Sequence, residues 1–127
     1  MPCKAETREI DGMQVYTMQL PASKAMELQI EMYGVIADTC LPFVKGDWTF
    51  GNILYIQKIA DRDALIQLIK YTCGNARIDG QELTGANFDQ VFSGNLSMIY
   101  KVFAFVLEVN FKDFFTQGLG LPKPAGK

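Results

Sequence analysis

The stretch that decides the fold is NLSMIYKVFAFVLEVN, residues 95–110. Its apolar side chains follow the helical repeat, and one stripe is made of Leu96, Ile99, Tyr100, Phe103, Val106 and Leu107. A second stripe on another face is made of Met98, Val102, Phe105 and Val109. A helix that is apolar nearly all round has to be covered nearly all round. The spacing therefore predicts a helix that is buried over most of its surface.

Two arrangements can supply that cover: other elements of the same chain wrap the helix, or a second copy of the chain covers it. The apolar pattern continues with Phe111, Phe114 and Phe115, again at helical spacing. This aromatic end has three interpretations: ordinary core, a partner or self-association surface, or the lining of a small-ligand pocket. Aromatic residues often dominate binding energy at interfaces. The candidate partner or self-association surface is therefore Met98, Val102, Phe105, Val109, Phe111, Phe114 and Phe115.

Before this helix, the sequence predicts a hairpin followed by helices. Asp11-Gly12 forms the turn of a β-hairpin over residues 7–20, because both turn positions accept positive φ. A helix is expected over 24–39, with Ser23 as its N-cap and Pro42 beyond its end. A shorter helix is expected over 52–60.

The middle of the chain carries clear start and stop signals. Asp61 is expected to cap a helix that stops at Gly74-Asn75. Asp79-Gly80 predicts a second, smaller hairpin between 76–78 and 81–83, too short to be stable without the rest of the domain. Asn87 is expected to begin a short helical turn closed by Gly94.

These elements predict an α+β fold that is mostly helical. About four helices are expected to pack with an N-terminal β-hairpin and a second short hairpin. The length of 127 residues fits a single domain. Residues 1–117 are expected to form that domain. Residues 118–127, GLGLPKPAGK, are rich in Pro and Gly and are expected to be a flexible tail.

Composition argues against catalysis and nucleic-acid binding. The chain has no histidine, which removes Ser-His-Asp and Cys-His catalysis and every His-containing metal site. The net charge is −2 with both signs interspersed, so the basic patch of a nucleic-acid binder is missing. Cys3, Cys40 and Cys73 lack a CxxC spacing and suit a reducing compartment. We expect no enzyme, no cofactor and no metal site, and interpret Asp61 and Asp63 as acids at a helix start.

The sequence also predicts a soluble protein. Residues 1–12 are polar and charged, unlike a secretory signal. The most apolar stretch, 96–111, carries Lys101 and Glu108 and is shorter than the ~20 residues that span a bilayer. We therefore expect no membrane anchor.

Several stretches together resemble a known protein family. They are YTMQLPA at 16–22, DGQEL at 79–83, Phe88-Asp89 with Phe92, and VLEVNFKDFF at 106–115. This succession, from about Ile10 to Phe115, resembles the tail assembly chaperones of long-tailed bacteriophages and prophages. Its most specific part is the stretch Glu-Val-Asn-Phe-x-Asp-Phe-Phe near the end.

The resemblance implies a function that composition does not show. Such chaperones look after the tape measure protein while tail tube subunits assemble around it. They act in the host cytoplasm, are absent from the mature virion, and many are also made in a longer, frameshifted form. Repeated apolar surface on a homo-oligomer would suit a long apolar client, because weak contacts add up through avidity. Two alternatives stay open: a virion structural component for head–tail joining or tail completion, and a small ligand-binding domain.

Overall fold

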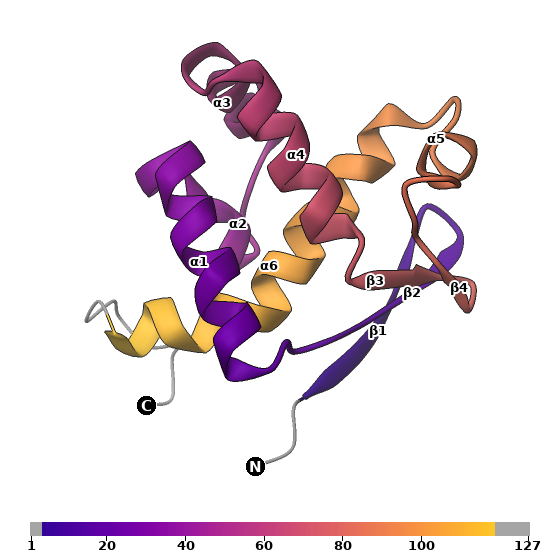
Figure 1. The fold of residues 1–127 in the computed structure, drawn as a ribbon, viewed down its shortest axis with the longest axis horizontal. Coiled ribbons are helices and arrows are strands. Elements are labelled where there is room, and N and C mark those ends of the chain that lie inside the picture. Colours follow the sequence, from indigo (N-terminus) through magenta and orange to yellow (C-terminus); the bar gives the residue numbers. More distant parts are fainter. Residues whose placement is uncertain (1–3, 119–127) are drawn as a thin grey trace.

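The computed structural model describes residues 4–118 (Figure 1). The chain begins with strands β1 (Ala5–Ile10) and β2 (Met13–Met18) and continues into helix α1 (Ala22–Ile36). A 3-10 turn, η1 (Ala37–Cys40), leads to α2 (Leu41–Lys45), α3 (Phe50–Ile59) and α4 (Arg62–Cys73). Strands β3 (Ala76–Ile78) and β4 (Gln81–Glu82), the short α5 (Phe88–Val91) and the long α6 (Leu96–Gly118) follow.

The fold is α+β and mostly helical, as predicted. Within residues 4–118, four helices have ten or more residues: α1, α3, α4 and α6. The predicted tail lies outside the described residues, apart from residue 118, which is the last of α6.

Both predicted hairpins are present, and they join into one antiparallel sheet of order β1-β2-β3-β4. Each hairpin turns at an Asp-Gly pair with positive φ at both residues, Asp11 and Gly12 in one and Asp79 and Gly80 in the other. This geometry matches the twist of the flanking strands. The two hairpins pair through Val15 opposite Ile78, so the short second hairpin gains the support that it needs.

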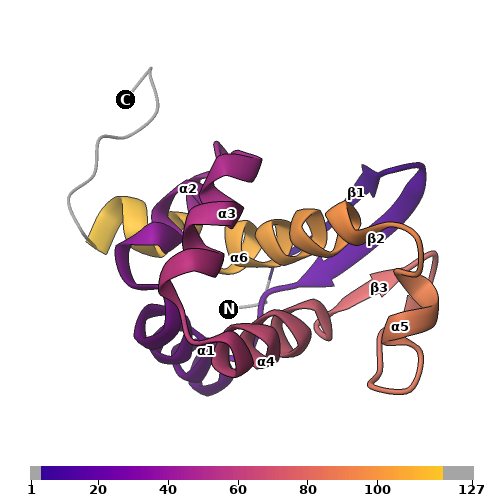
Figure 2. The same ribbon diagram turned by 90° about the horizontal axis from the view of Figure 1, so that it is seen from above.

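Helix α6 is the centre of the molecule (Figures 1 and 2). The sheet, α2 and α4 pack against it from several sides. Its large buried side chains come from both predicted stripes and from the aromatic end that follows them: Met98, Val102, Phe103, Phe105, Val106, Leu107, Phe111 and Phe115. Of the two arrangements that the sequence left open, the structure has the central helix wrapped by its own chain.

The predicted helix over 24–39 is wrong at both ends. Pro21, not Ser23, occupies the N-cap position, and it offers no side-chain cap. The helix ends at Ile36 because Ala37 has φ 51° and ψ −138°. With these dihedral angles the helical hydrogen-bond ladder cannot continue. Pro42 lies in the first turn of α2 instead of terminating a helix. A proline is tolerated there because its missing N–H would have no partner.

The other helix predictions are confirmed. The Asp61 carboxylate accepts a hydrogen bond from the Ala64 N–H at 3.0 Å and caps α4, which ends before Gly74. Helix α3 has a reciprocal cap between Thr49 and Asn52. These local signals fix where α3 and α4 begin.

Candidate functional site

Five of the seven side chains predicted to form a surface are buried. Met98, Val102, Phe105, Phe111 and Phe115 are each at most 4% exposed. The expectation that they lie open for a partner is therefore wrong, because the sheet and the helices around α6 already cover them. Val109 is partly buried against the core.

Phe114 is the exception and is 51% exposed. It borders an apolar groove of about 230 Å³ between α1 and α6, lined by Ala25, Met26, Gln29, Asn110, Phe111 and Phe114. The Phe114 ring is fixed edge-on against Phe115, with 5.0 Å between the ring centroids. We call these six residues the α1–α6 groove.

An exposed apolar stripe runs along α1 from this groove. Met26, Ile30 and Tyr33 are 59%, 61% and 50% exposed and follow one another at i, i+4 and i+7. The buried residues of the same helix, Leu28, Met32 and Ile36, lie on its other side. The helix is therefore apolar on two faces, although only one contacts the core. The spacing of this second stripe is visible in the sequence, but spacing alone does not indicate which of two apolar faces packs against the core.

A second exposed apolar surface lies on α3. Ile53 and Ile56 are buried, whereas the remaining large apolar residues of the helix are between 47% and 66% exposed: Phe50, Leu54, Tyr55 and Ile59. Exposed apolar surface is thus present, but α1 and α3 carry most of it and not the end of α6, where it was expected. Phe114 is the one member of the predicted set that belongs to it.

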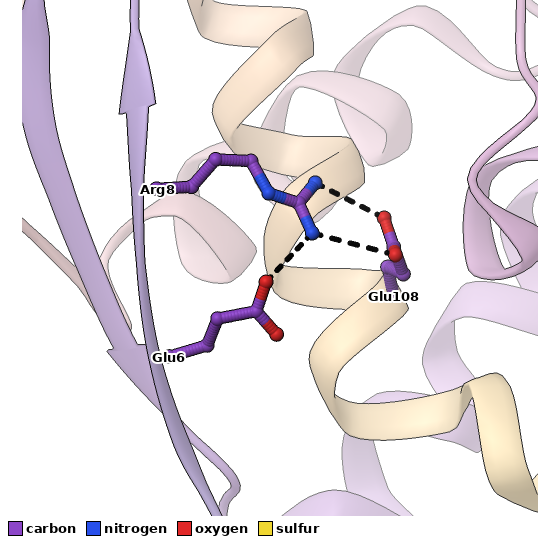
Figure 3. A network of polar contacts seen from close by, with 3 residues as sticks. All are labelled: Glu6, Arg8 and Glu108. Carbon is purple, nitrogen blue, oxygen red and sulfur yellow. Dashed lines mark hydrogen bonds and ion pairs between the residues drawn. The ribbon is translucent and has the colours of Figure 1, made fainter.

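The β-hairpin is fixed to α6 by an ion-pair network (Figure 3). Arg8 of β1 donates to both carboxylate oxygens of Glu108, with N–O distances of 3.2 and 3.4 Å, and to Glu6 at 2.8 Å. The guanidinium lies 4.5 Å from the centre of the Phe105 ring, so it covers part of the central helix. Partial burial opposes the charge of Arg8, but the hydrogen bonds that it donates to the Glu108 and Glu6 carboxylates outweigh this effect and raise its pKa.

Further polar contacts hold the hairpin at both ends. At the turn, Asp11 accepts from Lys101 at 2.7 Å and from Asn95 at 3.2 Å. The Lys101 hydrogen bond lowers the pKa of Asp11. After β2, the Leu20 N–H donates to the Asn110 side chain at 2.9 Å, and the Gln19 amide donates to the Val109 carbonyl at 3.0 Å.

These contacts give a physical role to the most specific stretch of the resemblance. Glu108, Val109 and Asn110 each bind the hairpin or its exit, and Phe111 is in the core. The Glu-Val-Asn-Phe pattern therefore preserves the fold and contributes only Phe111 and Asn110 to the α1–α6 groove.

The cysteine and aspartate residues considered as candidates for catalysis or metal binding are buried thiols, a helix cap and a surface ion pair. Burial raises the pKa of the Cys40 thiol to about 11 and also raises that of Cys73. Asp61 caps α4, and Asp63 is paired at the surface with Arg62 at 3.3 Å. Within residues 4–118, no three His, Cys, Asp or Glu side chains are grouped so that they could hold a metal ion. No helix in that part of the chain combines the length and apolar character needed to cross a bilayer.

Comparisons with known proteins identify the family. Neither a search of curated proteins nor a search of solved structures finds a match. A family model described as "Phage tail assembly chaperone protein, TAC" matches residues 11–122, which is most of the chain. That family is one of assembly chaperones and not of enzymes. The match runs from the turn of the first hairpin past residue 118 and so includes the groove and Glu108, whereas Glu6 and Arg8 of β1 lie before it. The chain belongs to the phage tail assembly chaperone family.

Proposed function

We propose that this protein binds the tape measure protein of a long-tailed phage and helps recruit tail tube subunits to it. It does so in the host cytoplasm and does not remain in the mature virion. Family membership supports a role in tail assembly. The observation that carries the binding proposal is the α1–α6 groove, an open apolar site beside an exposed apolar stripe.

The groove suits apolar side chains presented by a helix. Its volume of about 230 Å³ can take one or two large side chains, and its lining is mostly apolar apart from Gln29 and Asn110. A client helix lying along α1 could place apolar residues at i, i+3, i+4 and i+7 against Met26, Ile30 and Tyr33. Long client helices with repeated apolar faces would therefore be preferred over compact folded partners.

The test is co-purification with the tape measure protein encoded by the same phage. Phe114→Ser should weaken retention about tenfold or more, because exposed aromatic anchors at an interface often contribute at least ~1–2 kcal/mol. Leu54→Ser on α3 is the matched control, since Leu54 is 66% exposed but lies outside the groove. Equal loss in both variants, or no loss with Phe114→Ser, would show that the groove is not the client site.

Localisation requires a separate measurement. Mass spectrometry of purified virions should recover the tail tube protein abundantly and this protein only in traces. Recovery in stoichiometric amounts would contradict the chaperone proposal and favour a structural component of the particle.

A further inference from the structure

Strand β1 is an outer strand of the sheet, and the pairing of β2 with β3 determines which way its backbone N–H and C=O groups point. The Gln14 carbonyl accepts from Asp79 beyond β3 at 2.8 Å, so the backbone groups of Gln14 point toward β3. In an antiparallel ladder these directions alternate. The backbone groups of Val15 and Thr17 therefore point toward β1, where their partners are Arg8 and Glu6.

It follows that Ala5, Thr7 and Glu9 direct their N–H and C=O groups away from the sheet. All three residues are exposed, and no hydrogen bond from another residue in 4–118 reaches these outward groups. An edge of this kind is a template for pairing with another strand. The charges along this edge indicate which partner it fits.

We propose that the β1 edge pairs with the β1 edge of a second copy of this chain. The two strands run antiparallel about a twofold axis at Thr7. Thr7 then lies opposite Thr7 of the second copy, and Ala5 lies opposite Glu9. In this register all three outward-directed residues occupy hydrogen-bonded positions, and the two sheets become one.

Charge selects this register over its neighbours. With Thr7 on the axis, Glu6 lies opposite Arg8 in both halves of the interface, in positions where the side chains approach most closely. The two adjacent registers that keep the outward groups paired put Glu6 opposite Glu6 or Arg8 opposite Arg8. The edge is therefore complementary to itself in one alignment, and a second copy of the chain supplies the matching charges.

The hairpin is also held in a suitable position for this pairing. Arg8 is anchored to Glu108, and Asp11 to Lys101, so the strand does not have to be ordered on association. The side chains of Glu6 and Arg8 remain 47% and 39% exposed and can reach a second strand. The edge alone is smaller than a standard interface, so a reversible dimer is expected.

Single cysteines report the register directly. In a Cys3→Ser background, Thr7→Cys should give a covalent dimer with a thiol cross-linker shorter than about 10 Å. Ala5→Cys or Glu9→Cys alone should not, because equivalent residues would lie about 14 Å apart. A mixture of the Ala5→Cys and Glu9→Cys proteins should cross-link. Equal cross-linking of all three single variants, or none with Thr7→Cys, would overturn the proposal.

Charge reversal gives an independent readout by sedimentation equilibrium. Glu6→Lys should weaken dimerisation about tenfold, since it places like charges opposite each other twice. Glu9→Lys makes the same charge change opposite Ala5 and should have little effect. Loss of the same size in both variants would contradict the pairing. These measurements do not involve the tape measure protein, so a monomer that still binds it would refute the dimer and leave the proposed function intact.

Discussion

Ala37→Gly should stabilise the protein, although it removes a side chain. Ala37 is exposed and has φ 51° and ψ −138°, a conformation that is disfavoured for every residue except glycine. Such strain costs about 2 kcal/mol. Glycine adds roughly 0.7 kcal/mol of conformational freedom to the unfolded chain. The free energy of unfolding should therefore rise by about 1 kcal/mol and Tm by about 3–6 °C.

The measurement is reversible urea denaturation with a thermal melt as a check. Gly34→Ala, in the last turn of α1, is the matched control. Gly34 is helical and a Cβ there would meet no atom within 4 Å, so alanine should stabilise the helix by about 1 kcal/mol. Opposite substitutions three residues apart should thus both stabilise. If Ala37→Gly lowers the free energy of unfolding, as glycine does at an unstrained position, the reasoning fails.

Three further predictions concern the core, the hairpin turn and the thiols. Phe105→Ala should lower the free energy of unfolding by about 3–5 kcal/mol in urea titrations, whereas Leu96→Ala, at a 66% exposed position, should change it by less than about 1 kcal/mol. The pKa of Asp11 in the folded protein lies below its ordinary 3.8, so the stabilisation from the Lys101–Asp11 ion pair is fully present above pH 3.8 and is lost as the pH falls through the folded-state pKa. Asp11→Asn should therefore make the free energy of unfolding fall less steeply at acid pH. In a Cys3→Ser background, Cys40, with a pKa of about 11, should react with a thiol reagent at pH 8 only after denaturant is added, and prompt reaction of the native protein would contradict its burial.

Local sequence signals predicted much of the fold. The two Asp-Gly turns and the Asp61 cap act through a few neighbouring atoms, so their effect can be read without tertiary context. The end of α1 could not be predicted, because Ala37 carries no intrinsic preference for positive φ. Its conformation depends on how η1 and α2 pack against the rest of the molecule.

The candidate site was harder to predict for the same reason. Periodicity indicated that α6 is apolar on most sides, but not which of those sides the sheet would cover. Arg8 reaches Glu108 across 100 residues of sequence, and no local pattern connects the two. Phe114 differs from Phe115 only in lying one position round the helix, yet one ring is half exposed and the other is buried.

The attachment of the first hairpin to the last helix has a consequence for biosynthesis. The ribosome makes β1 and β2 early, but the ion-pair and hydrogen-bond partners that fix them to α6 lie between Asn95 and Asp113. Until that region emerges, the nascent hairpin lacks those partners and can pair only with the strands of the sheet, which are marginally stable without a helix to pack against. Contacts between such distant segments also slow folding. Completion of the native state therefore has to await synthesis of its final helix.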